Sequence, residues 1–403
     1  MSVDPIIEIS GLYKVFGNHP NQAIELLEQG SSKDEIFRET GQTVGVQKTN
    51  LTIHEGEIFV VMGLSGSGKS TLVRLLNRLI EPSSGEIRIR GRDVVTMSQA
   101  ELMELRRRDL AMVFQSFALM PHRTVIDNAA FGLEVAGVSR EQRHERAREA
   151  LRQVGLDANA DSYPDELSGG MQQRVGLARA LATDPSILLM DEAFSALDPL
   201  IRTEMQDELL ALQHKKRRTV VFISHDLDEA LRIGDRIAIM QDGLVVQVGT
   251  PEEIVTQPAN EYVRSFFYGV DIAQVFTAGD IMDKRQVTVV ERPGMGMRAA
   301  LESLRRHDGD YAVVVDDEQK YVGMVSADSL IKELEDSAEP SFRHALLPVD
   351  PVLPDAALDA LIGQAAATAV PLPVVDEDGI YRGTVSRTRL LRTLDRTGDN
   401  ENG

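Results

Sequence analysis

A Gly/Ser-rich segment with a single lysine is the part of this sequence best suited to chemistry. Residues 63–70 read Gly-Leu-Ser-Gly-Ser-Gly-Lys-Ser, between an apolar run and a helix-forming stretch. Glycines in this context let backbone N–H groups surround a phosphate, and the helix N-terminus adds partial positive charge. We expect Lys69 to bridge the β- and γ-phosphates of a nucleotide, Ser70 to ligate Mg²⁺ and Thr71 to reach the α-phosphate. The predicted phosphate-binding residues are Gly63, Ser65, Gly66, Ser67, Gly68, Lys69, Ser70 and Thr71.

Two carboxylates and a histidine follow apolar runs of strand length further along the chain. Ile187–Met190 is followed directly by Asp191 and Glu192, and Thr219–Ser224 is followed by His225. Asp191 is suited to holding Mg²⁺ through water, and Glu192 to polarising a water for in-line attack on a γ-phosphate. Ligands of open α/β sheets bind at the carboxyl edge of the strands, so we expect His225 to contact the γ-phosphate.

A second Gly-rich segment, Leu167-Ser168-Gly169-Gly170-Met171, precedes a predicted helix over Gln172–Leu181. Ser168 and the two glycines offer another anion site at a helix N-terminus. Taken alone, the segment is better explained as a plain serine N-cap followed by a glycine turn, and only the order of the motifs favours the anion site.

Alternating helices and strands must position these residues. After residue 171 the pattern predicts a mostly parallel sheet with helices on both faces. Residues 17–47 look inserted, and within them Ser32 and Glu35 fit a capping box. Residues 116–170 are helical and polar. We expect a helix over Ser70–Leu79, a hairpin around Pro82–Gly85 and a strand that ends at Gln115.

The sequence after residue 270 contains an internal repeat. Tyr321, Gly323, Val325 and Ser326 recur 60 positions later in a single register. Each copy contains a predicted helix between short strands, which is typical of supersecondary units that pack against a twin. The two copies span about residues 276–336 and 340–397.

Composition excludes several classes of protein. The chain has 403 residues, 42% hydrophobic and 26% charged, which is typical of a globular protein of two or three domains. Cysteine is absent, which excludes disulfides and thiolate metal sites. No apolar run reaches the ~18 residues of a membrane span, and we see no secretory signal. The net charge of −20 disfavours nucleic acid as a partner.

The set of motifs, in this order, resembles the ATPase subunits of ATP-binding cassette (ABC) transporters. The resemblance covers residues 6–265 and includes a Q-loop at Gln115, the signature segment 167–171 and the D-loop at 195–198. It implies an α/β P-loop NTPase fold with an antiparallel β-subdomain and a helical subdomain. It also implies that ATP lies between the P-loop of one copy and the signature segment of another, in a head-to-tail homodimer.

The resemblance assigns further roles to single residues. Phe16 is expected from its spacing to stack on adenine, with Tyr13 as the weaker candidate. The implied catalytic residues are Glu192, His225, Lys69 and Gln115, and the implied Mg²⁺ ligands are Ser70, Gln115 and Asp191. The other implied ATP contacts are Gln115, Ser168, Gly169, Gly170, Asp198 and His225.

Within that superfamily the chain resembles the ATPase subunits of glycine betaine/proline betaine importers, because of the insertion at 17–47, the stretch 59–71 and the C-terminal repeats. Those repeats resemble tandem CBS modules with an α+β fold. We expect an ABC ATPase domain over 1–270 and a regulatory CBS domain over 271–398. The CBS pair is interpreted as an ionic-strength sensor, a nucleotide site or a purely structural element.

The expected partners are a membrane permease bound through the helical subdomain and, indirectly, a substrate-binding protein. The expected location is the cytoplasmic face of the inner membrane, as a peripheral subunit. Alternative functions are the same motor for choline, carnitine or an amino acid, a non-transport ABC ATPase, and a nucleotide sensor without turnover.

Overall fold

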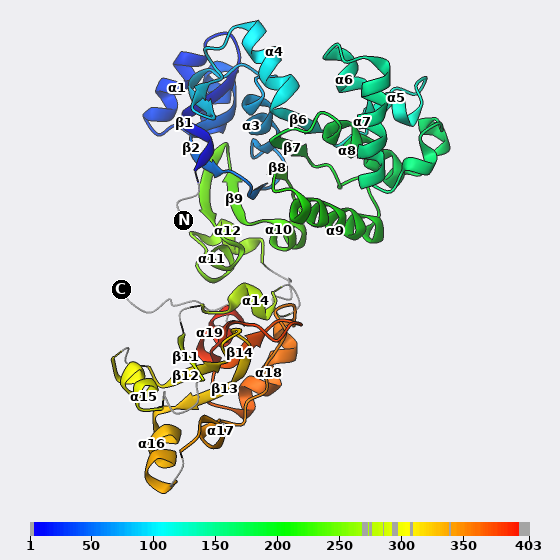
Figure 1. The fold of residues 1–403 in the computed structure, drawn as a ribbon. Helices are drawn as coiled ribbons and strands as arrows, with labels where there is room; N and C mark the ends of the chain where they lie inside the picture. Colours follow the sequence, from blue (N-terminus) through cyan, green and yellow to red (C-terminus); the bar gives the residue numbers. More distant parts are fainter. Residues whose placement is uncertain are drawn as a thin grey trace. The chain divides into compact units, whose positions relative to one another are not determined.

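A computed structural model describes residues 4–267, 273, 276–284, 286–291, 297–306, 309–337 and 340–394. The chain divides into two compact units (Figure 1). The first unit comprises residues 1–254 and 258–266, and the second comprises 255–257 and 267–403. The domain boundary predicted at residue 270 lies outside the described residues. No helix in the described part of the chain combines the length and apolar character needed to cross a bilayer.

A six-stranded, mostly parallel sheet forms the centre of the first unit, in the order β10-β9-β3-β8-β7-β6. Only the β9–β10 pair is antiparallel. The carboxyl ends of β3, β6, β7 and β8 therefore share one edge of the sheet. The strands are β3 (Ile58–Met62), β6 (Leu110–Val113), β7 (Ile187–Asp191), β8 (Thr219–Ile223), β9 (Arg236–Gln241) and β10 (Leu244–Gly249).

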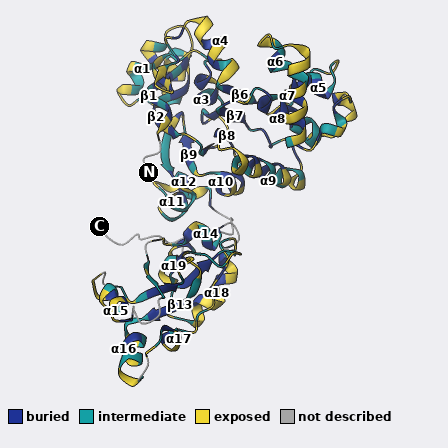
Figure 2. Ribbon diagram, viewed as in Figure 1, coloured by how far each residue is buried: buried dark blue, intermediate teal, exposed yellow. Residues whose placement is uncertain are grey.

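Continuous apolar sequence explains why these strands lie in the middle of the unit. Every residue of β3, β7 and β8 is buried, and the buried residues gather along the strands in Figure 2. Leu72 and Leu75 of helix α3 (Lys69–Leu76) belong to the same core as Phe59 of β3. Each fully buried leucine contributes about 1.5–3 kcal/mol, so the helix that follows the Gly-rich loop is held firmly against the sheet.

A four-stranded antiparallel sheet, in the order β2-β1-β4-β5, packs into the same core. Its strands are β1 (Pro5–Phe16), β2 (Thr43–His54), β4 (Ser84–Ile89) and β5 (Arg92–Asp93). The predicted hairpin around Pro82–Gly85 is wrong. β4 begins at Ser84 and pairs with β1, and the tight turn lies at Arg90-Gly91, where both residues have positive φ.

The inserted segment forms two short helices, α1 (Pro20–Glu28) and α2 (Lys33–Thr40), between β1 and β2. The predicted capping box is confirmed, because Ser32 Oγ accepts from the Glu35 backbone N–H and the Glu35 carboxylate accepts from Ser32 N. Gly41 ends α2 in the left-handed region with φ of 68°.

Helices cover the rest of the first unit. In Figure 1, α5 to α8 gather near the β6 side of the sheet. The predicted end of α3 at Leu79 is three residues too late, and α8 begins at Gly169 rather than Gln172. The helices are α4 (Gln99–Arg108), α5 (Val125–Ala129), α6 (Phe131–Val135), α7 (Arg140–Gln153), α8 (Gly169–Leu181), α9 (Pro199–Lys215), α10 (Leu227–Ile233), α11 (Pro251–Thr256) and α12 (Glu261–Ser265).

The second unit contains the repeat. Val314 lies opposite Gly323 in the β12–β13 pair, and Val374 lies opposite Gly383 in the β14–β15 pair, so the register recurs with the 60-residue offset. The elements are α14 (Ala278–Ile281), β11 (Val287–Val290), α15 (Met297–Arg306), β12 (Tyr311–Val315), β13 (Tyr321–Ser326), α16 (Ala327–Asp336), α17 (Phe342–Ala345), α18 (Leu358–Ala367), β14 (Leu372–Val375), β15 (Tyr381–Val385) and α19 (Arg387–Leu394).

The two copies of the repeat also bind each other reciprocally. Tyr321 N donates to Gly379 O at 2.9 Å, and Tyr381 N donates to Gln319 O at 3.3 Å. Each of these residues is the counterpart of another at the same offset. The copies therefore meet through equivalent strand starts, as expected for a repeat that packs on its twin.

Candidate functional site

The loop between β3 and α3 has the backbone shape of a phosphate cradle. Gly68 occupies the N-cap position of α3 with φ of 104° and provides no side-chain cap. A Cβ on Gly68 would lie 2.3 Å from Gly45 O, and one on Gly63 would lie 2.3 Å from Met240 O, so both positions require glycine. The first N–H groups of α3 are consequently available to an anion.

The Lys69 ammonium is folded back into this loop. Its Nζ donates to Gly63 O at 2.8 Å and to Leu64 O at 3.1 Å, and the residue is only 5% exposed. Burial lowers the pKa of Lys69, whereas the carboxylates of Glu192 and Asp191 oppose that change. The ammonium thus already lies among the loop carbonyls, where a phosphate oxygen can replace one of them.

Asp191 lies at the carboxyl end of β7, facing the first turn of α3. Its Oδ1 accepts from Ser70 Oγ at 2.8 Å, and its Oδ2 pairs with Arg74 Nη2 at 3.2 Å. A hydroxyl and a carboxylate this close are the oxygen ligands that Mg²⁺ prefers. No group of three or more His, Asp or Glu side chains suited to a metal occurs in the described ranges. Mg²⁺ that is shared with phosphate and water needs no such group.

Glu192 follows directly after β7, and residues that follow two other strands, β6 and β8, lie near its carboxylate. Gln115 Nε2 donates to Glu192 Oε2 at 3.2 Å, and His225 Nδ1 lies 3.7 Å from the same oxygen. Glu192 has φ of 48°, in the left-handed region that a non-glycine residue rarely occupies. The carboxylate is thus held at the sheet edge, beside an amide and an imidazole.

A cavity of about 580 Å³ lies against the P-loop and Glu192. Phe16, at the end of β1, is 40% exposed and lines it, and the Lys14 ammonium lies 5.0 Å from the centre of the Phe16 ring. The volume is in the range of small-ligand sites. The lining residues are Phe16, Lys33, Asp34, Phe37, Thr43, Val44, Gly45, Ser65, Gly66, Gly68, Lys69, Ser70, Thr71, Glu192 and Asp242.

The second Gly-rich segment lies outside this cavity. Ser168 is the N-cap of α8, and its Oγ accepts from Met171 N at 3.4 Å. A Cβ on Gly170 would lie 2.6 Å from Ile201 in α9. The residues predicted to bind nucleotide that do not line the cavity within one chain are Gly63, Ser67, Gln115, Ser168, Gly169, Gly170, Asp198 and His225.

Asp198 and His225 are linked through α9. Asp198 caps α9, its Oδ1 accepting from Ile201 N at 3.1 Å. Arg202, one turn on, donates to Leu197 O at 3.2 Å and to Asp226 Oδ2 at 3.0 Å. Arg202 therefore joins the segment before α9 to the residue after His225.

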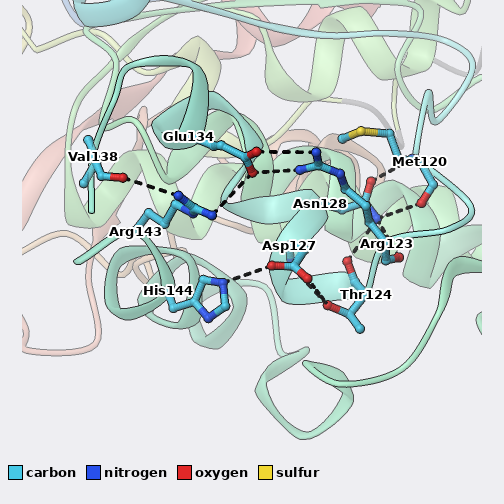
Figure 3. Close-up of polar contacts among 9 residues, drawn as sticks. All are labelled: Met120, Arg123, Thr124, Asp127, Asn128, Glu134, Val138, Arg143 and His144. Atoms are coloured by element: carbon cyan, nitrogen blue, oxygen red, sulfur yellow. Dashed lines mark hydrogen bonds and ion pairs between the residues drawn. The ribbon is translucent and has the colours of Figure 1, made fainter. Parts of the chain in front are cut away.

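The segment that follows Gln115 is fixed by a buried asparagine (Figure 3). Asn128 in α5 accepts from Met120 N at 2.7 Å, and its amide donates to three backbone carbonyls. Figure 3 also shows Glu134 between Arg123 and Arg143, and His144 beside Asp127. The helical segment is thereby braced independently of the cavity.

Several residues near the site were not predicted from the sequence, including Asp34, Thr43, Val44, Gly45 and Asp242 of the cavity lining. Arg74 pairs with Asp191, and Tyr262 Oη accepts from Leu64 N at 3.2 Å while donating to Met240 O. Lys33 and Phe37 line the cavity from the insertion. The sequence shows only that Lys33 and Phe37 are spaced i, i+4 within α2. This spacing does not indicate which surface of the protein they face.

A parallel sheet with a P-loop after one strand, carboxylates at the tip of another and a Ser-Gly-Gly helix start outside the cavity defines the class of ABC ATPases. The family model described as "ABC transporter" matches residues 46–195, and the one described as "CBS domain" matches residues 278–336.

The similar proteins narrow the class. The glycine betaine/proline betaine transport system ATP-binding protein ProV of Escherichia coli (strain K12) is 59% identical over 397 residues, covering 98% of each chain. The glycine betaine/carnitine transport ATP-binding protein GbuA of Listeria monocytogenes (strain 10403S) is 49% identical, covering 96% of this chain and 97% of the relative. This chain belongs to their family of ABC transporter ATP-binding subunits.

A solved structure supports the fold of the first unit. The dimeric post-hydrolysis state of the ATP-binding cassette MJ0796, bound to ADP and Pi, is 32% identical with a TM-score of 0.51. The match covers 61% of this chain and 98% of that one. The predicted ABC ATPase fold, followed by CBS sequence, is confirmed.

Proposed function

We propose that this chain is the ATP-hydrolysing subunit of an importer for glycine betaine and proline betaine. The observation that carries the ATPase activity is the meeting of Lys69, Asp191, Glu192 and His225 at one sheet edge beside a cavity. The substrate rests on the name of the Escherichia coli relative, which matches the chain over nearly its full length.

ATP binding starts at the P-loop. The open N–H groups at the start of α3 and the Lys69 ammonium hold the β- and γ-phosphates, with Ser65, Gly66 and Thr71 beside them. Phe16 stacks on the base at the other end of the cavity. The loop carbonyls that now hold Lys69 orient its ammonium before the phosphate arrives, so little side-chain entropy is lost on binding.

The residues present fit Mg²⁺. Ser70 and Asp191 would hold it, with Gln115 as the third ligand from the chain, and when bound it neutralises charge on the β- and γ-phosphate oxygens. Arg74 orients the Asp191 carboxylate from the side opposite Ser70. Gln115 now donates its amide to Glu192, which leaves its carbonyl oxygen for the ion.

Hydrolysis rests on Glu192. Its carboxylate takes the proton of the attacking water, and His225 stabilises the γ-phosphate on the other side. Gln115 holds the carboxylate in position. Because the side chain sits on a strained backbone, its direction is set by the strand end and the Ser195 turn, in which Ser195 Oγ donates to Glu192 O at 2.9 Å.

Ser168, Gly169, Gly170 and Asp198 act on the nucleotide of a second copy. A head-to-tail homodimer is supported by the dimeric state of the structural relative. The helical segment contacts a permease at the cytoplasmic face of the membrane, and a substrate-binding protein delivers the cargo. Residues 1–270 form the ATPase domain and 271–398 the regulatory domain.

Uptake of labelled glycine betaine at high osmolality tests the proposal. The host lacks its other betaine importers and carries the cognate permease and binding protein. We expect uptake with the wild-type chain and none with Lys69→Ala. If the wild-type chain hydrolyses ATP but supports no betaine uptake, the substrate is wrong. Labelled carnitine and choline are then tested in the same cells.

A further inference from the structure

The insertion between β1 and β2 is the part of the first unit that the proposed function leaves unused. It is firmly packed, because Ala23 of α1 and Ile36 of α2 are fully buried against Val15 and Val44 of the two strands. Its second helix is closed at both ends by the Ser32–Glu35 capping box and by Gly41. The position of α2 on the sheet is therefore fixed by packing and by its own caps.

This packing directs one face of α2 toward the nucleotide cavity. Lys33 and Phe37, spaced i and i+4, both line that cavity, while Ile36 points into the core. The Phe37 ring is 57% exposed, and Phe16 is 40% exposed. Two exposed aromatic rings thus line one small cavity from two different elements, where each would lose contact with water on binding a flat apolar ligand.

Lys33 adds charge to the same wall. Partial burial lowers its pKa, and the carboxylates of Asp242 and Asp34 oppose that change. Asp242 lies beside the P-loop, since its neighbour Gly243 donates to Ser67 O at 2.9 Å. The ammonium of Lys33 therefore lies on the same cavity as the phosphate-binding loop and carries the sign of charge that attracts a polyphosphate.

We propose that α2 is a wall of the nucleotide site, with Phe37 in contact with the nucleobase and Lys33 attracting the phosphates. This rests on the proposed function, because it assumes that ATP occupies the cavity. Because the phosphates bind at the P-loop, the base is the part of ATP left to contact the aromatic rings that line the same cavity. An aromatic contact of this kind accepts any base, so Phe37 contributes affinity and little selectivity among purines.

Calorimetric titration of the full chain with Mg²⁺ and a non-hydrolysable ATP analogue tests the wall. We expect Phe37→Ala to weaken binding about tenfold, in line with the loss of one stacked base contact. The same substitution should weaken binding of the corresponding GTP analogue by a similar factor. Phe37→Tyr should bind like wild type, and Lys33→Gln should weaken binding about threefold. Inorganic tripolyphosphate, which has no base, should bind Phe37→Ala and wild type equally.

Glu39→Ala is the matched control, since Glu39 is exposed on α2 and does not line the cavity. Unchanged analogue binding by Phe37→Ala, with weakened binding by Phe16→Ala, would overturn the wall and leave the proposed function standing. If Phe37→Ala weakened the binding of tripolyphosphate as much as that of the ATP analogue, Phe37 would have a purely structural role. That result would also overturn the proposal that α2 contacts the base. A wild-type chain that binds neither analogue would instead refute the proposed function. Phe37→Leu replaces Phe37→Ala if thermal melting shows that the latter is unfolded.

Discussion

The first unit has two helices that begin after a Ser/Gly-rich segment, and they begin differently. Helix α3 starts at Gly68, which has φ of 104° and offers no side-chain cap, and its loop lines the cavity. Helix α8 starts at Ser168, whose hydroxyl already accepts from Met171 N, and its glycines lie away from that cavity. In the sequence the second segment offered an anion site much like the first, although taken alone it was better explained as a plain serine N-cap.

In the proposed function the P-loop is a complete phosphate site, whereas the signature segment is half of one. The P-loop has open N–H groups, a buried cation and a carboxylate within one chain. The signature segment offers a helix N-terminus and does not line the cavity of its own chain. In the proposed head-to-tail dimer a second copy faces it, which would give each nucleotide two helix N-termini.

The largest expected effect comes from a substitution in the P-loop. Lys69→Ala removes the buried ammonium that lies against Gly63 O and Leu64 O. We expect a loss of ATPase activity of about 1,000-fold or more, together with weaker nucleotide binding, because charge on the transferring phosphate loses its main partner. Steady-state phosphate release and analogue titration measure the two effects. An unaltered affinity would mean that the backbone N–H groups alone hold the phosphates.

A second substitution separates chemistry from binding in the same half. Glu192→Gln keeps the shape of the side chain and its contact with Gln115 but removes the base. We expect about 100-fold slower hydrolysis with unchanged or tighter ATP binding. Size-exclusion chromatography with Mg²⁺ and ATP should show a dimer that the wild type forms only transiently. Equal hydrolysis by both proteins would remove Glu192 from the base assignment.

Ser168→Ala removes the hydroxyl of the signature segment. We expect about tenfold slower ATP hydrolysis with unchanged nucleotide affinity, because the P-loop is untouched. Ser139→Ala is the matched control. Ser139 caps α7 with the same 3.4 Å contact, so its loss costs similar helix stability, about 1 kcal/mol, away from the signature segment.

Mixing two inactive or slow variants tests whether each site is shared between two copies. Lys69→Ala and Ser168→Ala subunits together form one site in which the P-loop and the signature segment are both intact. Activity of the mixture above the mean of the separate proteins is expected, whereas a strict average would argue against sites shared between copies.

The smallest effect concerns a buried carboxyl group on α10, which begins two residues after His225. Glu229 accepts from Ser224 Oγ at 2.5 Å and from Gln206 Nε2 at 3.2 Å, and burial raises its pKa. Its contribution to stability is thus fully present below the unfolded pKa and lost as the pH rises through the folded pKa. Glu229→Gln should match wild type in acid and melt about 2–4 °C higher at pH 8. Glu104→Gln, on the exposed face of α4, is the control, and a pH-independent difference would contradict the assignment.

Features that depend on local sequence could be predicted well. The capping box of α2 needs only Ser32 and Glu35, and the P-loop needs a strand, a glycine pattern and a helix in direct succession. The repeat was visible as one register, and the two hairpins keep that register. In each case the contacts that decide the structure lie within a few residues or repeat at a constant offset.

Features that depend on contacts between distant segments could not be predicted from the sequence. The turn predicted at Pro82–Gly85 instead became the start of a strand, because Ser84 pairs with Tyr13 of β1 and the chain turns only at Arg90-Gly91. Local turn residues compete with pairing to a strand about seventy positions away, and no nearby pattern reveals which interaction is stronger.

The class of chemistry could be predicted from the sequence alone, because the loop that carries Lys69 follows one strand, and Asp191 and Glu192 stand at the end of another, where parallel strands share an edge. Which groups meet at that edge depends on tertiary packing. Gln115 and His225 reach one carboxylate from separate strands. Phe37 reaches the cavity because Ile36 is buried beneath α2. Such contacts arise from packing among segments far apart in the chain, and neither periodicity nor propensity specifies that packing.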